Sequence, residues 1–403
     1  YKPNNMISIS NLVFRMKKNA VGLATIAILS SMVLVTLVGA ASIYAGKKDY
    51  LASVAPHDYS VTGTNVDLTS TEKIMDDFLA QSGNQVNEKA EVTYLYFGIK
   101  EQEKNKLTIF PENERKVLPK SIFLVFSQAT YKQLTGKDLN LASNQVGLHS
   151  KSKTLKDQKS LSFNGQTYQI QDDVNDFIKG KVPNIFTIIV SDYNYLVVPD
   201  MDDFKESVKG TATTQATYVG VNVKDPTHDA KKNSDLLDQM TDKETQQLAG
   251  QNTGVSQSYL TANSQYDTEG MLNGFVGGTL FIGIFLSIIF MLGTVLVIYY
   301  KQISEGYEDR ERFVILQKIG LDDLQVKQTI RKQVLTVFFL PLIFAFIHLA
   351  FAYHMLSLIV RIIGVFNPSL MLVVTIIVCG VFFLAYVLVF ALTSRSYRRI
   401  VSM

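Results

Sequence analysis

Four long apolar runs divide the sequence. Residues 20–46, 271–300, 333–360 and 368–393 contain no Lys, Arg, Asp or Glu. Each run has at least the roughly 20 residues that a helix needs to cross a bilayer. The pattern predicts an α-helical membrane protein with four transmembrane helices, one before and three after a large polar region.

The polar region, residues 47–270, mixes strand and helix patterns. Runs rich in β-branched and aromatic residues predict strands at residues 91–100, 121–126, 185–190 and 217–223. Apolar positions at helical spacing predict helices at residues 71–80, 128–134 and 229–248. Asn164-Gly165 predicts a hairpin turn. Residues 140–160 and 250–264 are polar and are expected to be loops. A mixed α/β domain follows from this pattern.

Charge fixes the expected orientation. Acidic residues outnumber basic ones in residues 47–270, whereas basic residues outnumber acidic ones elsewhere. Outside that region, every Lys and Arg except Arg361 falls in residues 1–19, 301–332 or 394–403. Cytoplasmic segments are enriched in Lys and Arg. We therefore expect three segments to be cytoplasmic: the amphipathic lead-in (residues 1–19), the loop (residues 301–332) and the tail (residues 394–403). Residues 47–270 are then extracellular.

Composition narrows the function classes. Cys379 is the single cysteine, so the polar region cannot be held by disulfides and needs a packed core. The sequence contains no phosphate-binding GxxxxGK[ST] motif and no HExxH motif, and no basic stripe typical of nucleic-acid binding. His57, His149 and His228 lack metal-ligand spacing and are expected to be surface residues. We therefore expect a non-catalytic chain that binds no metal and no nucleic acid.

Aromatic residues alternate on two expected strands. Tyr94, Tyr96 and Phe97 lie on one, and Tyr193 and Tyr195 on the other. They can form either a surface for a peptide or lipid-linked ligand, or ordinary core packing. Core packing is the preferred interpretation, which leaves the ligand site unknown.

The polar loop between the second and third spans contains a predicted helix. Phe313, Leu316, Gln317 and Gly320 lie along one side of it, and Glu308 precedes Arg312 by four residues. Gly320 predicts the helix end, and Asp322 predicts the cap of the next helix. We interpret residues 305–320 as an amphipathic helix parallel to the membrane that binds a soluble partner and passes its movement to the spans. An anchoring helix is the alternative.

Three stretches in and after this loop resemble a known family. These are YYKQISEGYEDRERF (299–313), QKIG (317–320) and IRKQVLTVFFLP (330–341), the last followed by Ile347 and His348. They resemble the last FtsX-like permease unit of the BceB family, membrane subunits of ABC transporters that act on peptide antibiotics such as bacitracin. The resemblance covers both ends of the chain, about half its length. It implies a FtsX/MacB-like one-plus-three arrangement, with a further unit upstream of this C-terminal portion.

The resemblance also implies partners and a location. In related permeases this loop is the coupling helix that docks on the ATPase, so the expected coupling residues are Glu305, Glu308, Arg310, Arg312, Phe313, Leu316, Gln317 and Gly320. ATP would bind to that partner, with no cofactor on this chain. Further expected partners are a sensor histidine kinase, membrane lipids and a peptide antibiotic bound to an undecaprenyl lipid. The location is a bacterial cell membrane.

Two alternatives stay open at this point. One is another FtsX-like machine, for lipoprotein release or for regulation of wall hydrolases. The other is a scaffold that senses peptide for a histidine kinase without an ATPase. One residue inside the third span, His348, is a separate functional candidate, because ionisable groups within a membrane are costly.

Overall fold

The computed structural model describes residues 20–114, 119–152, 154–184, 186, 190, 192–249, 257–318, 323–362 and 367–401. They form two compact units. One unit is Lys48–Asn273, and the other consists of the residues on either side of it. Each unit is described in turn.

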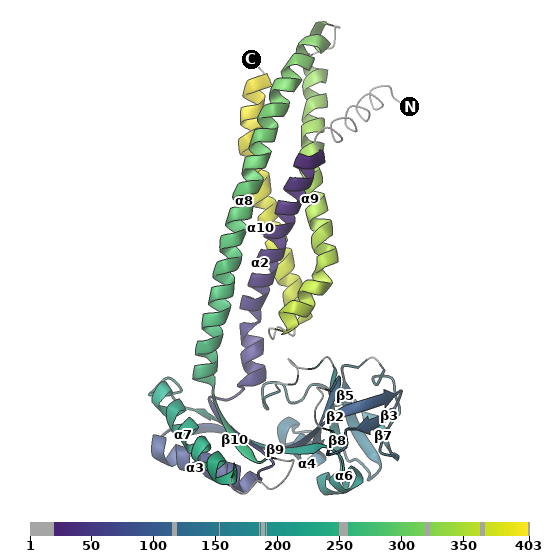
Figure 1. The fold of residues 1–403 in the computed structure, drawn as a ribbon, viewed down its shortest axis with the longest axis vertical. Coiled ribbons are helices and arrows are strands. Elements are labelled where there is room, and N and C mark those ends of the chain that lie inside the picture. The colour runs from purple at the N-terminus through teal and green to yellow at the C-terminus, as the bar shows by residue number, and fades with distance from the viewer. Residues whose placement is uncertain are drawn as a thin grey trace. The chain divides into compact units, whose positions relative to one another are not determined.

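The flanking unit is built from long helices. They are α2 (Ala20–Val54), α8 (Gln265–Lys318), α9 (Asp323–Ile362) and α10 (Pro368–Val401), which run alongside one another (Figure 1). Each contains a stretch long and apolar enough to cross a membrane. Large apolar side chains such as Phe281 and Phe351, 69% and 82% exposed, point outward. The four predicted spans are therefore present.

Small residues allow α2 and α8 to approach closely. A Cβ added to Gly283 on α8 would lie 2.4 Å from the Cβ of Ala40 on α2. The hydroxyls of Thr36 and Ser287 are hydrogen-bonded across the same pair of helices at 2.9 Å. By contrast, a Cβ on Gly274, Gly277 or Gly278 would meet no described atom within 4 Å. Of these four glycines of α8, only Gly283 therefore lies in contact with another described helix.

Pro341 lies inside α9 without ending it. A proline lacks the N–H that would bond the carbonyl four residues earlier, which loosens the helix at that turn. The carbonyl concerned is that of Val337. In the same turn, the Tyr386 hydroxyl of α10 donates to the next carbonyl, that of Phe338, at 2.9 Å. Contacts with neighbouring helices help to make a proline tolerable in a transmembrane helix.

The Lys48–Asn273 unit is organised around a mixed sheet. Its strands are β1 (Tyr59–Thr64), β2 (Val86–Glu103), β3 (Lys106–Ile109), β4 (Ser121–Ser127), β5 (Gln145–Ser150), β6 (Ser160–Phe163), β7 (Gln166–Asp172), β8 (Asp192–Val198), β9 (Thr213–Val223) and β10 (Tyr259–Ser264). Their order is β10-β1-β9-β2-β3-β6-β7-β5-β8-β4. An additional pairing of β4 with Leu95–Ile99 of β2 closes the strands from β2 to β4 into a ring.

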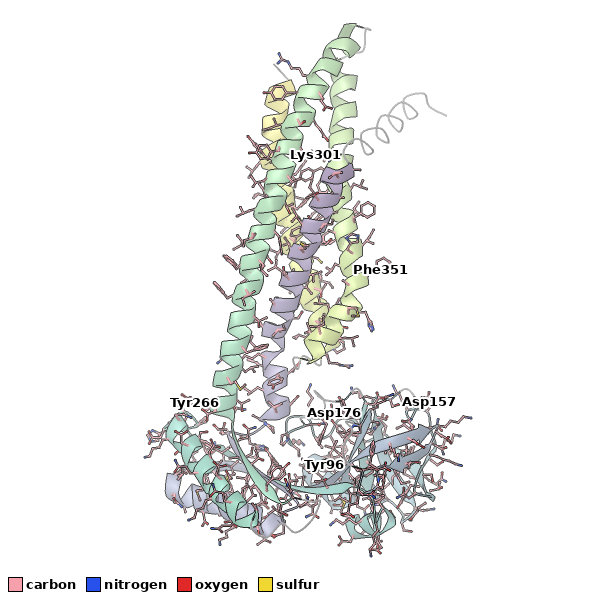
Figure 2. The ribbon with its side chains drawn as sticks, in the orientation of Figure 1. Tyr96, Asp157, Asp176, Tyr266, Lys301 and Phe351 are labelled. Carbon is pink, nitrogen blue, oxygen red and sulfur yellow. The ribbon has the colours of Figure 1, made fainter. Side chains whose placement is uncertain are left out.

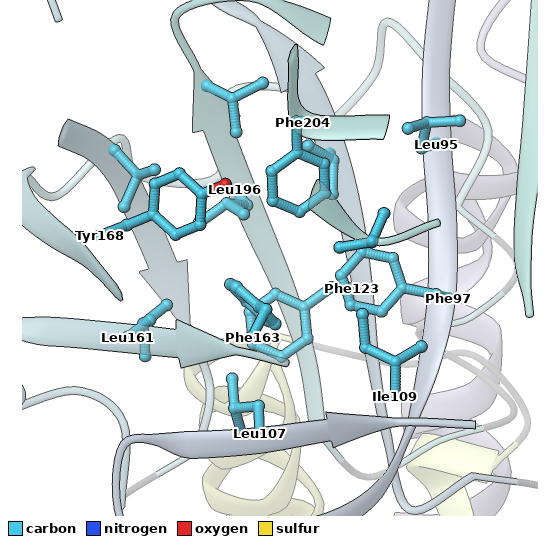
Figure 3. Close-up of a cluster of buried hydrophobic side chains, with 14 of the residues drawn as sticks. Leu95, Phe97, Leu107, Ile109, Phe123, Leu161, Phe163, Tyr168, Leu196 and Phe204 are labelled. Carbon is cyan, nitrogen blue, oxygen red and sulfur yellow. The ribbon is translucent and has the colours of Figure 1, made fainter. Parts of the chain in front are cut away.

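Alternation along the strands fills this ring. Leu95, Phe97 and Ile99 of β2 join one buried cluster with Phe123 and Phe163 (Figure 3). The Phe97 and Phe123 rings are stacked with centroids 5.7 Å apart. Phe204, on the short helix α6 (Met201–Ser207), packs against the same cluster. Every strand of the ring supplies side chains to this core, so period-two patterning builds it.

The opposite face of β2 packs into a second core. Tyr94 and Tyr195 are 5% and 1% exposed, and Tyr96 and Tyr193 pack against them. The helix α4 (Gln128–Thr135) lies on this side through Tyr131. The interpretation of the alternating aromatics as core packing is thus confirmed.

A third core lies where β10, β1 and β9 meet two helices. Val219 and Val221 of β9 pack with Phe78 of α3 (Leu68–Ser82) and Leu237 of α7 (Ala230–Ala249). The α3 helix begins with Asp67, whose carboxylate accepts from the Ser70 N–H at 2.8 Å, and ends at Gly83 in the left-handed region. Both ends follow the usual capping rules, and the helix extends beyond the predicted residues 71–80 in both directions.

Several predicted elements match and others do not. The strands in β2, β4 and β9, the three helices and the Asn164-Gly165 turn are present, with Phe163 paired to Gln166 across that turn. Residues 140–160 were expected to be a loop, but they contain β5, and residues 250–264 contain β10. The strand expected at residues 185–190 falls mainly outside the described residues, and Phe186 within it is helical.

Candidate coupling segment

The second span and the expected coupling helix form one element. The helix α8 runs from Gln265 to Lys318 without a break. Between Tyr300 and Lys318 the sequence has no proline and a single glycine, Gly306, among Glu, Arg, Lys and Gln residues that favour helix. As far as Lys318, the structure therefore corrects the expectation of a separate helix parallel to the membrane. The segment continues the span.

The first turns of the segment have two different faces. Gln302 is 6% exposed, and the side chain of Glu305 is 14% exposed, so both face into the helical unit. Tyr307 is 59% exposed, and Glu308 and Arg310 are also exposed. Of the expected coupling residues, Glu308 and Arg310 are therefore accessible to a partner, whereas Glu305 contacts its own unit.

For the remaining expected coupling residues, the structure describes at most the backbone. Arg312, Phe313, Leu316 and Gln317 belong to α8, and their side chains lie outside the described residues. Gly320 and the expected cap at Asp322 also lie outside them. The helix α9 begins at Asp323.

His348 lies on α9 next to α2. Its Nδ1 is 3.1 Å from the Ser31 hydroxyl. That hydroxyl has one proton, which it donates to the Ala27 carbonyl at 2.7 Å. We therefore assign the proton on Nδ1 to His348, as donor to Ser31. The ring itself is exposed, so the structure shows an interhelical hydrogen bond and leaves a functional role as a proposal.

Lys301 is largely buried, which the sequence analysis does not predict. It was expected to open a polar loop, yet its side chain is 13% exposed. Its Nζ lies 3.8 Å from where a Cβ of Gly22 on α2 would be, and 4.0 Å from the Glu305 carboxylate. One feature of the sequence does indicate this burial. Lys301 lies three residues after Ile298 and four before Glu305, and Gln302 lies next to it on the same helical face.

The histidines of the sheet-rich unit differ in environment. His57 is 3% exposed and its Nδ1 lies 2.7 Å from the Tyr218 hydroxyl, so the expectation of a surface residue is wrong. His149 contacts Asp173 at 3.2 Å, and His228 is exposed. Within the described residues, no group of three or more His, Cys, Asp or Glu side chains is arranged to hold a metal ion.

These features define a multi-pass membrane protein with a large sheet-rich domain between its first and second spans. No family model matches the chain. Curated proteins do match, and they are ABC transporter permeases. The chain is 35% identical over 79 residues to the ABC transporter permease protein YxdM of Bacillus subtilis, which is 20% of this chain and 13% of that protein.

Two further relatives are described as bacitracin export permease proteins. Identity to the bacitracin export permease protein BceB of Bacillus subtilis is 28% over 138 residues, 34% of this chain and 19% of that protein. Identity to BceB of Halalkalibacterium halodurans is 22% over 371 residues, 86% of this chain and 51% of that protein. The predicted resemblance to BceB-like ABC transporter permeases is confirmed. The chain spans at most about half the length of these relatives.

Proposed function

We propose that this chain is part of the permease subunit of an ABC transporter that protects a bacterium from antimicrobial peptides such as bacitracin and senses them. The relative that matches 86% of the chain is a bacitracin export permease, and this match is the main support. In this proposal the chain is not an enzyme. A separate ATPase, present as a homodimer, binds and hydrolyses ATP.

The charge distribution supports the orientation. The end of α8 carries Lys301, Arg310, Arg312 and Lys318, and the end of α10 carries Arg395, Arg398 and Arg399. These are the ends that the positive-inside rule assigns to the cytoplasm. The sheet-rich unit would then face the outside, where a peptide bound to an undecaprenyl lipid is accessible.

The continuity of α8 suggests how force would travel. The helix starts at Gln265, directly after β10, and ends at Lys318 in the coupling segment. At 1.5 Å per residue, a helix of this length is about 80 Å long. A push from the ATPase on the exposed side of Tyr307, Glu308 and Arg310 would be passed along this continuous helix toward the sheet-rich unit. This movement would release the peptide from its lipid target. A sensor histidine kinase would respond to the conformational state of the permease.

Two alternatives make different forecasts. Another FtsX-like machine, for lipoprotein release or wall-hydrolase regulation, would use the same ATPase contact but give no peptide resistance. A scaffold that only senses peptide for a kinase would need no ATPase contact. The polar, helical and partly exposed end of α8 favours the two readings that include an ATPase.

Replacing Phe313 and Leu316 with Asp tests the proposal. The sequence places both on one side of the segment, and a charge buried in an apolar contact costs several kcal/mol. We expect the double variant to insert in the membrane, to lose copurification of the ATPase and to lose bacitracin resistance in cells. Ser304→Asp, which adds one aspartate at an exposed position just before the segment, is the control for added negative charge. Wild-type ATPase binding and resistance in the double variant would refute the coupling role.

A further inference from the structure

A small, partly open cavity lies in the helical unit beside Lys301. Its apolar wall includes Leu23 of α2 and Phe338 of α9, and its polar lining includes Lys301, Gln302 and Glu305 of α8. Lys301 is labelled in Figure 2. The cavity volume is ≈ 20 Å³. A cavity needs about 10–15 Å³ of such volume to hold one water molecule. The space is therefore sufficient for a single small ligand.

Three polar atoms at this cavity lack hydrogen-bond partners among the described residues. Nζ of Lys301 and both Nε2 and Oε1 of Gln302 are buried and make no hydrogen bond to any described residue. Glu305 is 4.0 Å from the Lys301 nitrogen, beyond hydrogen-bond distance. Buried donors and acceptors are expected to be satisfied, because leaving them unpaired is costly. Three such atoms at one cavity indicate a bound ligand.

The charges around the cavity decide the class of ligand. An anion would be attracted by Lys301 but repelled by Glu305, whereas a cation would be attracted by Glu305 but repelled by Lys301. The remaining hydroxyl at the cavity, on Tyr386, already donates to the Phe338 carbonyl. A neutral ligand that both donates and accepts can bond the ammonium, the amide oxygen and the amide nitrogen together. At this volume such a ligand is water.

We propose that Lys301 and Gln302 form a binding site for one ordered water molecule inside the helical unit. The water accepts from Lys301 Nζ and Gln302 Nε2, and it donates to Gln302 Oε1 and to the Glu305 carboxylate. Because the Lys301 side chain also packs over Gly22, the site joins α8 to the first turn of α2. Water-mediated bonds are nearly as favourable as direct ones, so this joint can be strong without direct side-chain pairing.

Hydroxyl-radical footprinting of the whole protein in lipid nanodiscs tests this site. Radicals generated by X-rays from a bound water modify the side chains around it even where bulk solvent has no access. Tyr386 is 0% exposed and lines the cavity, whereas Phe382 on the same helix is 3% exposed and does not line it. We expect Tyr386 to be modified several-fold faster than Phe382.

Gln302→Leu removes the amide at similar volume and leaves the charged pair intact. It should reduce modification of Tyr386 to the rate of Phe382, and Lys301→Met should do the same. Ile298→Leu, in the apolar wall of the cavity, should leave the rate unchanged. A Tyr386 rate equal to that of Phe382 in the native protein would overturn the proposal. So would a fast rate that persists in both polar variants.

Discussion

The imidazole of His57 is held in a buried position by Tyr218 of β9. Burial lowers the pKa of His57 below its ordinary value, and the nearby carboxylates of Glu88 and Asp58 only partly oppose this effect. A buried neutral histidine must be charged or exposed when the solution becomes acidic. This side chain therefore makes the stability of the sheet-rich unit dependent on pH.

We expect the stability to fall as the pH drops below about 6.5, the ordinary pKa of histidine. The folded pKa is lower than the unfolded one, so the unfolded state binds more protons in that range and is favoured. Calorimetric unfolding of the whole protein between pH 8 and pH 5 checks this. In His57→Gln the loss of stability should be smaller over the same range. An unchanged pH dependence in that variant would show that other groups cause it.

Single residues were predictable where a pattern included them. The alternation of Tyr94, Tyr96 and Phe97 indicated a buried strand, and the structure confirms it. His57 belongs to no such pattern, because it follows Pro56 in a connection and its partner Tyr218 is 161 residues away. Contacts this distant depend on strand order, which local sequence does not encode.

At the scale of elements, the contact of α2 with α8 depends on one glycine. A side chain at Gly283 would clash with Ala40 and approach the Thr36 carbonyl at 3.4 Å. Both atoms belong to the body of α2 and cannot move independently of it. Overpacking of this kind typically costs about 1–3 kcal/mol.

Gly283→Leu should therefore lower the unfolding temperature of the detergent-solubilised protein. Gly278→Leu is the matched control, because it lies on the same helix and a Cβ there meets no described atom within 4 Å. It should be neutral or stabilising, since leucine favours helix over glycine by up to about 1 kcal/mol. Equal losses in the two variants would contradict the observed α2–α8 contact.

Elements with strong periodicity were predictable and polar strands were not. The four spans, α3 and α7 follow from apolar spacing alone. The strand β10 has the sequence YLTANS with only Leu260 and Ser264 buried, and it is held by pairing to β1. The sequence pattern does not predict the unbroken α8, because the change from apolar to polar residues after Tyr300 is typical of the end of a membrane-spanning helix. Helix continuity depends on backbone propensity, which stays high through Lys318.

At the scale of the whole chain, the sequence predicted an inserted α/β domain between the first span and the last three, and the two units reflect that division. It did not predict the closed ring of strands. That ring needs β2 to pair with both β3 and β4. The 18 residues of β2 are long enough for these two pairings and for a further pairing with β9 outside the ring. The arrangement therefore emerges from pairing between distant segments.

The central claim is that the end of α8 binds an ATPase in the cytoplasm. Replacing Tyr307, 59% exposed, with the photo-crosslinking residue benzoylphenylalanine tests both the contact and the orientation in native membranes. Phe351 on α9, 82% exposed and within an apolar span, is the matched control position. We predict an ATPase adduct from position 307 on illumination and none from position 351. No ATPase adduct from position 307, or equal adducts from both positions, would contradict the claim.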